Sequence, residues 1–263
     1  MFKDIIKNPC AKVVAVPTLS DNYAYLLIDP VTKNGLCVDP AEPKKVIDAA
    51  KDEGVLLKSA LCTHKHWDHS GGNREIKKLI PEIEIVGSAY EQIPAVTKSV
   101  QDGDVIPFGS LEIKCIKASC HTIGQIMYFV HSPTNPDLQP ILFTGDTIFI
   151  AGCGRFFEGS AKMMLEIMQK LEVLPPETLI YCGHEYTVNN LKFAQTVDES
   201  PEVTEKLKWA QDTRKQGLPT VPSTLKQERT YNPFMRTSHL QSVMGQDSIE
   251  STMKKLRDLK DRF

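Results

Sequence analysis

The run THKHWDH constrains this chain more than any other feature, because it places four metal-binding side chains within six residues: His64, His66, Asp68 and His69. It follows an apolar segment that is predicted to be a strand, Leu57 to Thr63. Side chains two residues apart in an extended chain point to the same side, so His64 and His66 can face one ion. Asp68 and His69, in the turn that follows, can face a second ion beside it. Imidazole and carboxylate groups are ligands for zinc and similar divalent ions.

Four ligands cannot complete two metal shells, so the fold must bring others to the same place. Three candidates follow apolar strand-like runs or lie in the adjoining turns: His121 in SCHTIGQ, Asp146 in FTGDT and His184 in YCGHEY. Strand ends at one edge of a sheet commonly form ligand sites. We expect one ion on His64, His66 and His121, and the other on Asp68, His69 and His184. Asp146 can lie between them, because a carboxylate has two oxygens and can bridge two ions.

The apolar pattern predicts an α/β fold in which mixed sheets are covered by helices, over residues 1–185. Strands are expected at 12–16, 23–28, 35–38, 57–63, 82–86, 111–116, 126–130, 141–144 and 178–181, and helices at 43–53, just after Gly72, and from an N-cap at Ser160. After about residue 185 the strand-like runs end. Helices are expected at 187–197, 201–217 and 247–260, so residues 186–263 are predicted to form a separate helical domain.

Composition excludes several classes of protein. Lys and Arg number 31 against 33 Asp and Glu, which argues against a general nucleic-acid binder. No apolar run approaches the length of a membrane helix, and we read no targeting segment at the N-terminus. The seven cysteines form no CxxC pair, so a reducing, cytoplasmic location without disulfides is expected. The HExxH zinc-protease motif and the GxSxG serine-hydrolase motif are both absent.

Longer motifs resemble a known family. THKHWDH with the later His, Asp and His is similar to the metallo-β-lactamase superfamily. Within it, FTGDTIFIAGCGRFFEGSAKMM, IYCGHEYTVNNLKFA and PTVPSTLKQERTYNPFMR resemble the glyoxalase II family, from about Lys12 onward. The resemblance implies an αββα sandwich with two metals at one edge and a C-terminal helical domain that helps to bind a thiol carrier. It also implies hydrolysis of S-(2-hydroxyacyl)glutathione, such as S-D-lactoylglutathione, the last step of methylglyoxal detoxification.

The same resemblance implies the residues that bind the carrier: Arg155, Phe157, Tyr186, Arg257 and Lys260. Phe157 lacks the hydroxyl that a Tyr would offer there. Basic residues suit the two carboxylates of glutathione. Gln125 stands where family members usually have His, which bears on support of the metal ligands and not on the ligands themselves. The first eleven residues resemble an extension that the family does not need.

The chemistry that these residues permit is metal-assisted hydrolysis. Two divalent ions can lower the pKa of a water molecule and stabilise the oxyanion formed on a thioester carbonyl. Asp68 can orient the attacking water, and a thiolate leaves without a dedicated general acid. We expect zinc, with iron or manganese as alternatives, in a monomer. Two other readings stay open: an iron-dependent glutathione persulfide dioxygenase of the same superfamily, and a non-catalytic protein that binds acyl-thiols or a partner.

Overall fold

The first of two six-stranded sheets is built from the N-terminal third of the chain. The computed structural model describes residues 5–263. Strand order in this sheet follows the sequence: β1 (Lys12–Thr18), β2 (Asn22–Ile28), β3 (Asn34–Val38), β4 (Leu56–Leu61), β5 (Glu84–Ser88) and β6 (Lys98–Val100). The first three strands are antiparallel, and β3 to β6 are parallel. The carboxyl end of β4 therefore leads directly into the THKHWDH run.

The second sheet faces the first and is also mixed. Its order is β14 (Ser223–Thr224), β13 (Leu179–Cys182), β10 (Ile141–Gly145), β9 (Ile126–His131), β8 (Leu111–Lys117) and β7 (Val105–Phe108). The strands β7 to β10 are antiparallel, whereas β10 and β13 run parallel as neighbours. Two candidate ligands, Asp146 and His184, thus follow adjacent strands that end at the same edge of the sheet.

The core lies between the two sheets, as the alternation of side chains along β2 shows. Every residue of β2 is buried. Tyr25 and Leu27 belong to the large cluster between the sheets, whereas Leu26 and Ile28 face a smaller cluster beneath the helices on the outer side. Successive side chains of a strand point to opposite faces, so a strand buried on both faces is apolar throughout.

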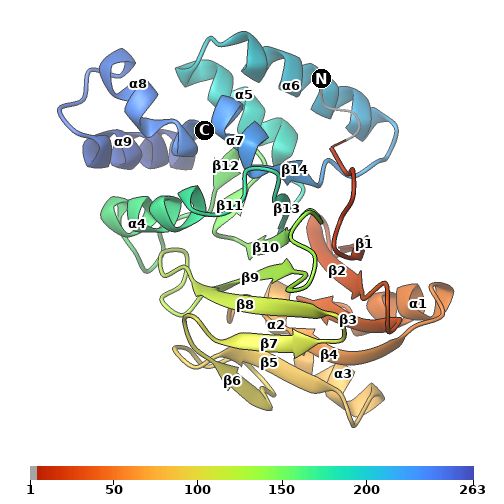
Figure 1. Ribbon diagram of the computed structural model, residues 1–263. Coiled ribbons are helices and arrows are strands. Elements are labelled where there is room, and N and C mark those ends of the chain that lie inside the picture. The colour runs from red at the N-terminus through yellow and green to blue at the C-terminus, as the bar shows by residue number, and fades with distance from the viewer. Residues whose placement is uncertain (1–4) are drawn as a thin grey trace.

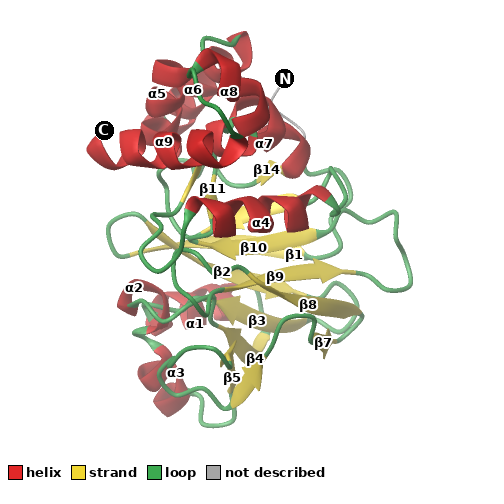
Figure 2. Cartoon of the chain, turned by 90° about the vertical axis from the view of Figure 1, so that its left-hand side faces the viewer, coloured by secondary structure: helices red, strands yellow, loops and turns green. Residues whose placement is uncertain are grey.

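Helices cover both outer faces, which gives four layers (Figures 1 and 2). The first sheet is covered by α1 (Pro43–Asp52), with α2 (Trp67–Ser70) and α3 (Asn73–Leu79) nearby. The second sheet is covered by α4 (Ala161–Glu172), which begins where Ser160 accepts a hydrogen bond from the Met163 amide. The predicted αββα arrangement of mixed sheets is confirmed.

The C-terminal helices lie above α4 and the end of the second sheet (Figure 1). They are α5 (Thr187–Val197), α6 (Pro201–Lys215), α7 (Leu225–Tyr231), η1 (Pro233–Met235), α8 (Thr237–Val243) and α9 (Ile249–Arg262). Strands do not end at residue 185 as expected, because β14 pairs with β13 in the second sheet. A strand of two residues is too short to show an alternating pattern of apolar and polar residues in the sequence. The division into domains at residue 185 stays a prediction.

Several other elements differ from the expectation. The strands β6 and β7 were not predicted, and a small hairpin of β11 (Ile148–Phe149) and β12 (Gly152–Cys153) lies between Asp146 and the next helix. Asp68 and His69 lie on the single helical turn α2 instead of an open turn. Because helical residues one apart are rotated by about 100°, these two side chains approach the site from different directions.

The predicted N-terminal extension is packed against the body of the protein where it is described. The amides of Lys7 and Asn8 donate to Oε1 of Gln139, and the Cys10 amide donates to the Gln139 carbonyl. Residues 1–4 of the extension lie outside the described residues. Over residues 5–263, no helix combines the length and the apolar character that crossing a bilayer requires.

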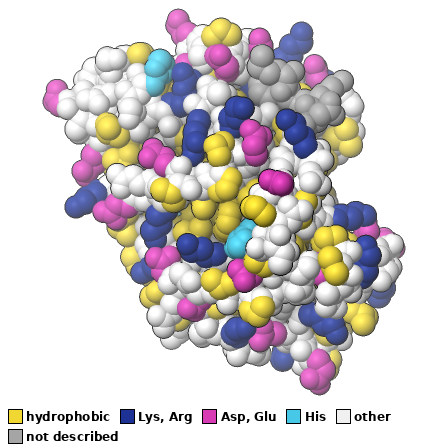
Figure 3. All heavy atoms as spheres, viewed as in Figure 1, with side chains coloured by type: hydrophobic (Ala, Val, Ile, Leu, Met, Phe, Trp, Pro, Cys, Tyr) yellow, Lys and Arg dark blue, Asp and Glu magenta, His cyan; other side chains and the backbone are white. Residues whose placement is uncertain are grey.

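The face of the molecule in Figure 3 mixes acidic and basic side chains, and neither sign forms a continuous patch. Hydrophobic side chains gather at its middle, below the C-terminal helices. This distribution fits the formal net charge of −2.

Candidate metal centre

The predicted ligands come from four separate segments of the chain, residues 64–69 and the turns at 121, 146 and 184, which meet where the two sheets end. His64 and His66 follow β4, Asp68 and His69 lie on α2, His121 follows β8, Asp146 follows β10, and His184 follows β13. A bridge between Asn22 and His184 joins the two sheets at this edge. All seven residues are brought together.

The seven side chains form three overlapping groups in which the ligand atoms lie within 4.8 Å of one another: His64 with His66 and His121; His64 with His69 and Asp146; and Asp68 with His69 and His184. The first and third groups are the two sets that the sequence predicted. His131 and His239, the remaining histidines of the chain, belong to none of these groups among the described residues.

Ring nitrogens approach one another closely in the first group. Nδ1 of His66 lies 3.0 Å from Nε2 of His64 and 3.0 Å from Nε2 of His121. A ring nitrogen carries one proton at most, so it cannot donate to both neighbours. Three converging nitrogens are the arrangement that a cation satisfies, and the donor set is therefore suited to a metal ion.

The outward nitrogens of the histidines are held by acceptors. Nδ1 of His69 lies 2.9 Å from Asp39 Oδ2, Nδ1 of His184 lies 2.8 Å from Asp21 Oδ1, and Nδ1 of His121 lies 3.0 Å from the Arg155 carbonyl. A ring that donates its Nδ1 proton outward keeps a lone pair on Nε2 for a metal. These partners therefore fix both the tautomer and the direction of each ring.

Asp146 lies between the two predicted sets. Its Oδ2 is 3.5 Å from Nε2 of His121 and 3.2 Å from Nε2 of His184, and its Oδ1 is 3.3 Å from Nε2 of His69. Burial opposes ionisation of Asp146, but the adjacent rings of His69 and His184 hold its pKa well below the ordinary value. Oδ1 is buried and has no hydrogen-bond partner beyond this approach of the His69 ring. A buried, ionised oxygen whose only close partner is an imidazole nitrogen at 3.3 Å fits a metal ligand.

Burial is the largest influence on the pKa of two other candidate ligands, His64 and His121. It lowers the pKa of His64 well below the ordinary value, and the positive charge that His69 can carry adds to the effect. Burial also lowers the pKa of His121. Both imidazoles are therefore kept neutral, which is the form that binds metal.

Glycine is required at position 183 by a close approach. A Cβ there would lie 2.3 Å from Oδ1 of Asp146 and 2.7 Å from Cε1 of His69. Neither side chain can move away without leaving the ligand cluster. The motif YCGHEY thus serves the site through Gly183 as well as through His184.

A cavity of about 660 Å³ opens from the ligand cluster toward the C-terminal helices. His66, Asp68, His121, Asp146 and His184 line one end of it. All five residues that the sequence assigned to the carrier line the same cavity: Arg155, Phe157, Tyr186, Arg257 and Lys260. A molecule that reaches the metal ligands can therefore touch the C-terminal helices at the same time.

Two aromatic side chains connect the ends of this cavity. The Tyr186 ring stacks on the ring of His184, with centroids 4.6 Å apart. Phe157 is 62% exposed, and its ring lies 5.2 Å from that of His121. Both can contact an acyl group or a thioester sulfur held beside the ligands.

The basic residues of the cavity differ in how firmly their side chains are held. Arg257 is buried, and its guanidinium donates to the Cys153 carbonyl at 2.8 Å and pairs with Asp261 at 2.8 Å. Arg155 is exposed and also approaches Asp261, at 3.4 Å. Lys260 donates to the Asn189 side chain, and burial lowers its pKa to about 8.

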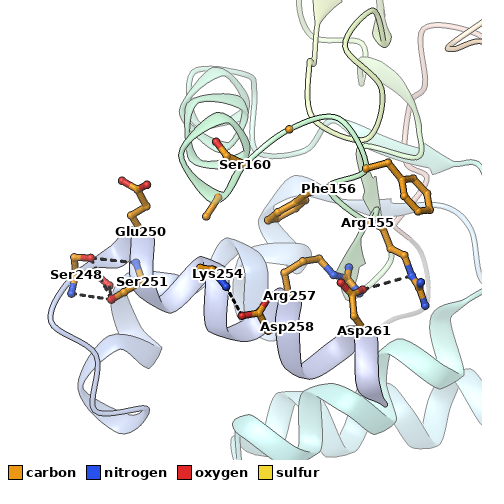
Figure 4. Close-up of a pocket in the computed structure, with 13 residues that line it drawn as sticks. Arg155, Phe156, Ser160, Ser248, Glu250, Ser251, Lys254, Arg257, Asp258 and Asp261 are labelled. Atoms are coloured by element: carbon orange, nitrogen blue, oxygen red, sulfur yellow. Dashed lines mark hydrogen bonds and ion pairs between the residues drawn. The ribbon is translucent and has the colours of Figure 1, made fainter.

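A second cavity, of about 700 Å³, lies beside the first. It is bounded by α9, the start of α4 and the loop that precedes α4 (Figure 4). It shares Arg155, Phe157, Arg257 and Asp261 with the first cavity. None of the seven predicted metal ligands lines it. Of these two cavities, only the first is lined by candidate ligands.

Gln125 is fully buried next to the turn that carries Asp146. Its Nε2 donates to the Thr144 carbonyl at 3.0 Å and to the Thr147 hydroxyl at 2.9 Å. Through these two bonds Gln125 holds residues on both sides of Asp146.

Three further residues at the site were not predicted from the sequence: Asp39, Asp21 and Trp67. Asp39 accepts from the amide and hydroxyl of Thr63 besides facing His69, and Asp21 faces His184. Each lies more than 20 residues from its histidine, so no local spacing reveals the pair. Trp67 is 71% exposed and lines the cavity. Its position inside the THKHWDH run could have indicated that it lies beside the ligand cluster.

Comparisons with known proteins give a match to a family model and matches to relatives over nearly the whole chain. Residues 185–263 match the family model described as "Hydroxyacylglutathione hydrolase C-terminus". The chain is 43% identical over 257 residues to "Hydroxyacylglutathione hydrolase cytoplasmic" of Arabidopsis thaliana, which covers 96% of this chain and 99% of that protein. It is 42% identical to a "Hydroxyacylglutathione hydrolase-like protein" of Gallus gallus, over 96% of this chain and 90% of the relative.

Solved structures support the fold. ETHE1 from Myxococcus xanthus superposes with a TM-score of 0.68 at 20% identity, over 95% of this chain and 90% of that one. A metallo-beta-lactamase from Staphylococcus aureus superposes with a TM-score of 0.66 at 21% identity, over 96% and 72% of the two chains. At such identities the likeness concerns the fold alone.

Proposed function

Because this chain belongs to the hydroxyacylglutathione hydrolase family, we propose that it hydrolyses the thioester bond of an S-(2-hydroxyacyl)glutathione, such as S-D-lactoylglutathione. The products are glutathione and a 2-hydroxy acid. The observation that carries the proposal is the convergence of seven His and Asp side chains at one end of a cavity whose other end is basic.

The ligand cluster is proposed to hold two divalent ions. His64, His66 and His121 are assigned to one ion, Asp68, His69 and His184 to the other, and Asp146 to both. When bound, such ions lower the pKa of a water molecule and stabilise negative charge on a carbonyl oxygen. Zinc is the expected ion, with iron or manganese as alternatives.

Asp68 is proposed to orient the attacking water. Its Oδ2 accepts from the side-chain amide of Asn22 at 3.0 Å, and the carboxylate also lines the cavity. A carboxylate has lone pairs left after one such bond, so it can accept a hydrogen bond from the water that attacks the thioester. Asn22 fixes the carboxylate and so fixes the direction of attack.

The leaving group needs little help from the protein. A thiol has an ordinary pKa of about 8.5, so the thiolate departs without a dedicated acid. The remaining task is to hold the carrier. Lys260, Arg257 and Arg155 supply positive charge for its carboxylates, and Tyr186 and Phe157 supply the walls.

The experiment is turnover of S-D-lactoylglutathione by the purified protein, followed as loss of the thioester and release of free thiol. Oxygen uptake with glutathione persulfide is measured on the same preparation, which tests the dioxygenase alternative. Thioester hydrolysis without oxygen uptake is expected. Oxygen uptake without hydrolysis would overturn the proposal in favour of the alternative, and neither activity would contradict both. We also infer a cytoplasmic location, because the Arabidopsis relative is named cytoplasmic.

A further inference from the structure

The hairpin of β11 and β12 occupies the stretch between two points of the metal centre. Asp146 lies two residues before it. Arg155, two residues after it, accepts the Nδ1 proton of His121 through its carbonyl, at 3.0 Å. Within the hairpin, the ring of Phe149 lies 5.8 Å from that of His184. A shift of this hairpin would therefore displace groups next to three candidate ligands, Asp146, His121 and His184.

The hairpin has little means of holding itself. Its strands have two residues each, with Ile148 opposite Cys153 and Phe149 opposite Gly152. Ala151, in its turn, has a φ of +59°, a left-handed conformation that residues other than glycine rarely adopt. A hairpin this short is not stable by its own pairing, so its shape must come from neighbours.

Those neighbours are three buried polar residues of the C-terminal segment: Asn190, Glu228 and Asn232. Glu228 accepts from the Ala151 amide at 2.8 Å. Asn232 donates to the carbonyls of Gly152 and Phe149, at 3.1 and 3.3 Å, and Asn190 donates to the Ile150 carbonyl at 3.1 Å. Every residue from Phe149 to Gly152 is thus bonded through its backbone to α5, α7 or the residue that ends α7.

Glu228 is the centre of this set. It is fully buried on α7, and both of its oxygens are used. Oε2 accepts from Ala151 and from Asn232, while Oε1 accepts from the hydroxyls of Ser223 and Tyr231, at 2.5 and 2.8 Å. Burying a carboxylate is unfavourable unless its oxygens are bonded. Four donors from separate positions satisfy it and fix the place of the Ala151 amide.

We propose that Glu228 is a positioning residue for the metal centre: it holds the turn of the hairpin, and through the hairpin it sets the Arg155 carbonyl and the ring of His121. The C-terminal segment then has a task besides carrier binding, which is to shape one side of the ligand cluster. This inference rests on the metal chemistry proposed above.

Two variants of Glu228 separate the hydrogen bonds from the charge. In Glu228→Gln, the amide oxygen can still accept from Ala151 and Asn232, and the amide nitrogen can donate to the Ser223 and Tyr231 oxygens. Glu228→Leu fills a similar volume but accepts nothing. Removing a group that supports a metal ligand by hydrogen bonding typically lowers metal affinity or activity by about 10–100-fold. Glu228→Leu is expected to lose zinc affinity and kcat in that range with KM for the thioester within about two-fold, and Glu228→Gln is expected to stay near the parent protein.

The ring proton of His121 gives a direct reading of the geometry. In zinc-loaded protein the Nδ1 proton that bonds to the Arg155 carbonyl is observable by NMR, as is the His69 proton that bonds to Asp39 on the far side of the cluster. We expect Glu228→Leu to shift the His121 resonance or to speed its exchange with solvent, while that of His69 stays in place. An unchanged His121 resonance would overturn the proposal.

A control for general destabilisation is Leu240→Ala, in the buried face of α8. If this variant weakens zinc binding as much as Glu228→Leu does, the role of Glu228 is merely structural and the proposal fails. Should Glu228→Leu not fold, Ser223→Ala removes one donor to Glu228, and a smaller change of the His121 resonance is expected. A parent protein that binds no zinc and hydrolyses no thioester would contradict the proposed function instead.

Discussion

The two ends of the main cavity hold their polar groups in different ways. At the metal end the histidines are fixed from behind by Asp39, Asp21 and the Arg155 carbonyl. At the carrier end Lys260 and Arg155 are partly or largely exposed and contact neighbouring side chains near the surface. The difference teaches that one end is preorganised for chemistry, whereas the other can adapt to a flexible molecule. Changes at the metal end should therefore lower kcat, and changes at the carrier end should raise KM.

The largest effect is expected from removing a ligand. Asp146→Asn should release at least one metal and lower kcat/KM by about 1,000-fold, because metal stabilisation of the reaction is worth several kcal/mol. His121→Ala should lower turnover as sharply with the fold intact. Metal analysis, steady-state kinetics and circular dichroism check these results.

The matched control is His131→Ala, which removes a histidine outside the three ligand groups. It should leave metal content and turnover unchanged. Two metals retained by Asp146→Asn would contradict its place between the ions, and near-normal turnover of His121→Ala would remove His121 from the ligand set.

A crowding variant sharpens the claim that the metal end is fixed. Gly183→Ala places a methyl group 2.3 Å from Oδ1 of Asp146 and 2.7 Å from His69. We expect loss of metal affinity and of kcat by about 100-fold or more, since these ligands must move together. Gly217→Ala, where a Cβ has open space but φ is +71°, controls for the general cost of replacing glycine. Normal zinc binding by Gly183→Ala would show that the cluster can adapt after all.

A smaller loss of metal affinity or activity is expected when a hydrogen-bond partner of a ligand is changed. Asp39→Asn weakens the acceptor of the His69 Nδ1 proton and should lower metal affinity or kcat by about 10–100-fold. Asp29→Asn is the control, because Asp29 is a buried carboxylate that instead accepts from Thr32 and Ser110 in a loop. Equal losses of activity in the two variants would assign the effect of Asp39 to stability and not to metal support.

The carrier end is tested by Lys260→Ala. Loss of one charge-assisted hydrogen bond at a half-buried site should raise KM for the thioester by about 3–10-fold and leave kcat within two-fold. Lys255→Ala removes an exposed lysine from the same helix and should change neither constant. A fall in kcat with KM unchanged would contradict the assignment of Lys260 to the carrier. Arg257→Ala should alter both constants, since Arg257 also donates to the Cys153 carbonyl.

The smallest effect is a dependence of carrier affinity on pH. Burial lowers the pKa of Lys260 to about 8, so the ammonium form prevails below that pH and is lost as the pH rises through it. Binding of an S-alkylglutathione, which has no free thiol, should therefore weaken above about pH 8. In Lys260→Arg the decline should vanish, because arginine stays charged. Calorimetric titration between pH 7 and 9 measures both, and the same decline in Lys260→Arg would assign it to another group.

The sequence predicted the cluster of His and Asp side chains because its members follow local patterns. It missed the contacts that join distant parts of the chain. The THKHWDH run and the Ser160 cap are fixed by spacing within a few residues. The bonds from Asp39 to His69 and from Glu228 to Ala151 join residues 30 and 77 positions apart. The strand β14 exists only through its pairing with β13. Such contacts follow from the packing of the sheets and helices, which no local pattern records.

The central claim is that turnover depends on two ions held by the seven ligands. The most direct measurement is a titration of metal-stripped protein with zinc, in which bound metal per chain and hydrolysis of S-D-lactoylglutathione are followed together. We predict that activity is absent after chelation and returns with readdition, reaching its maximum near two ions per chain. Full hydrolysis in the metal-stripped protein, or a maximum at one ion per chain with no second ion bound, would contradict the account.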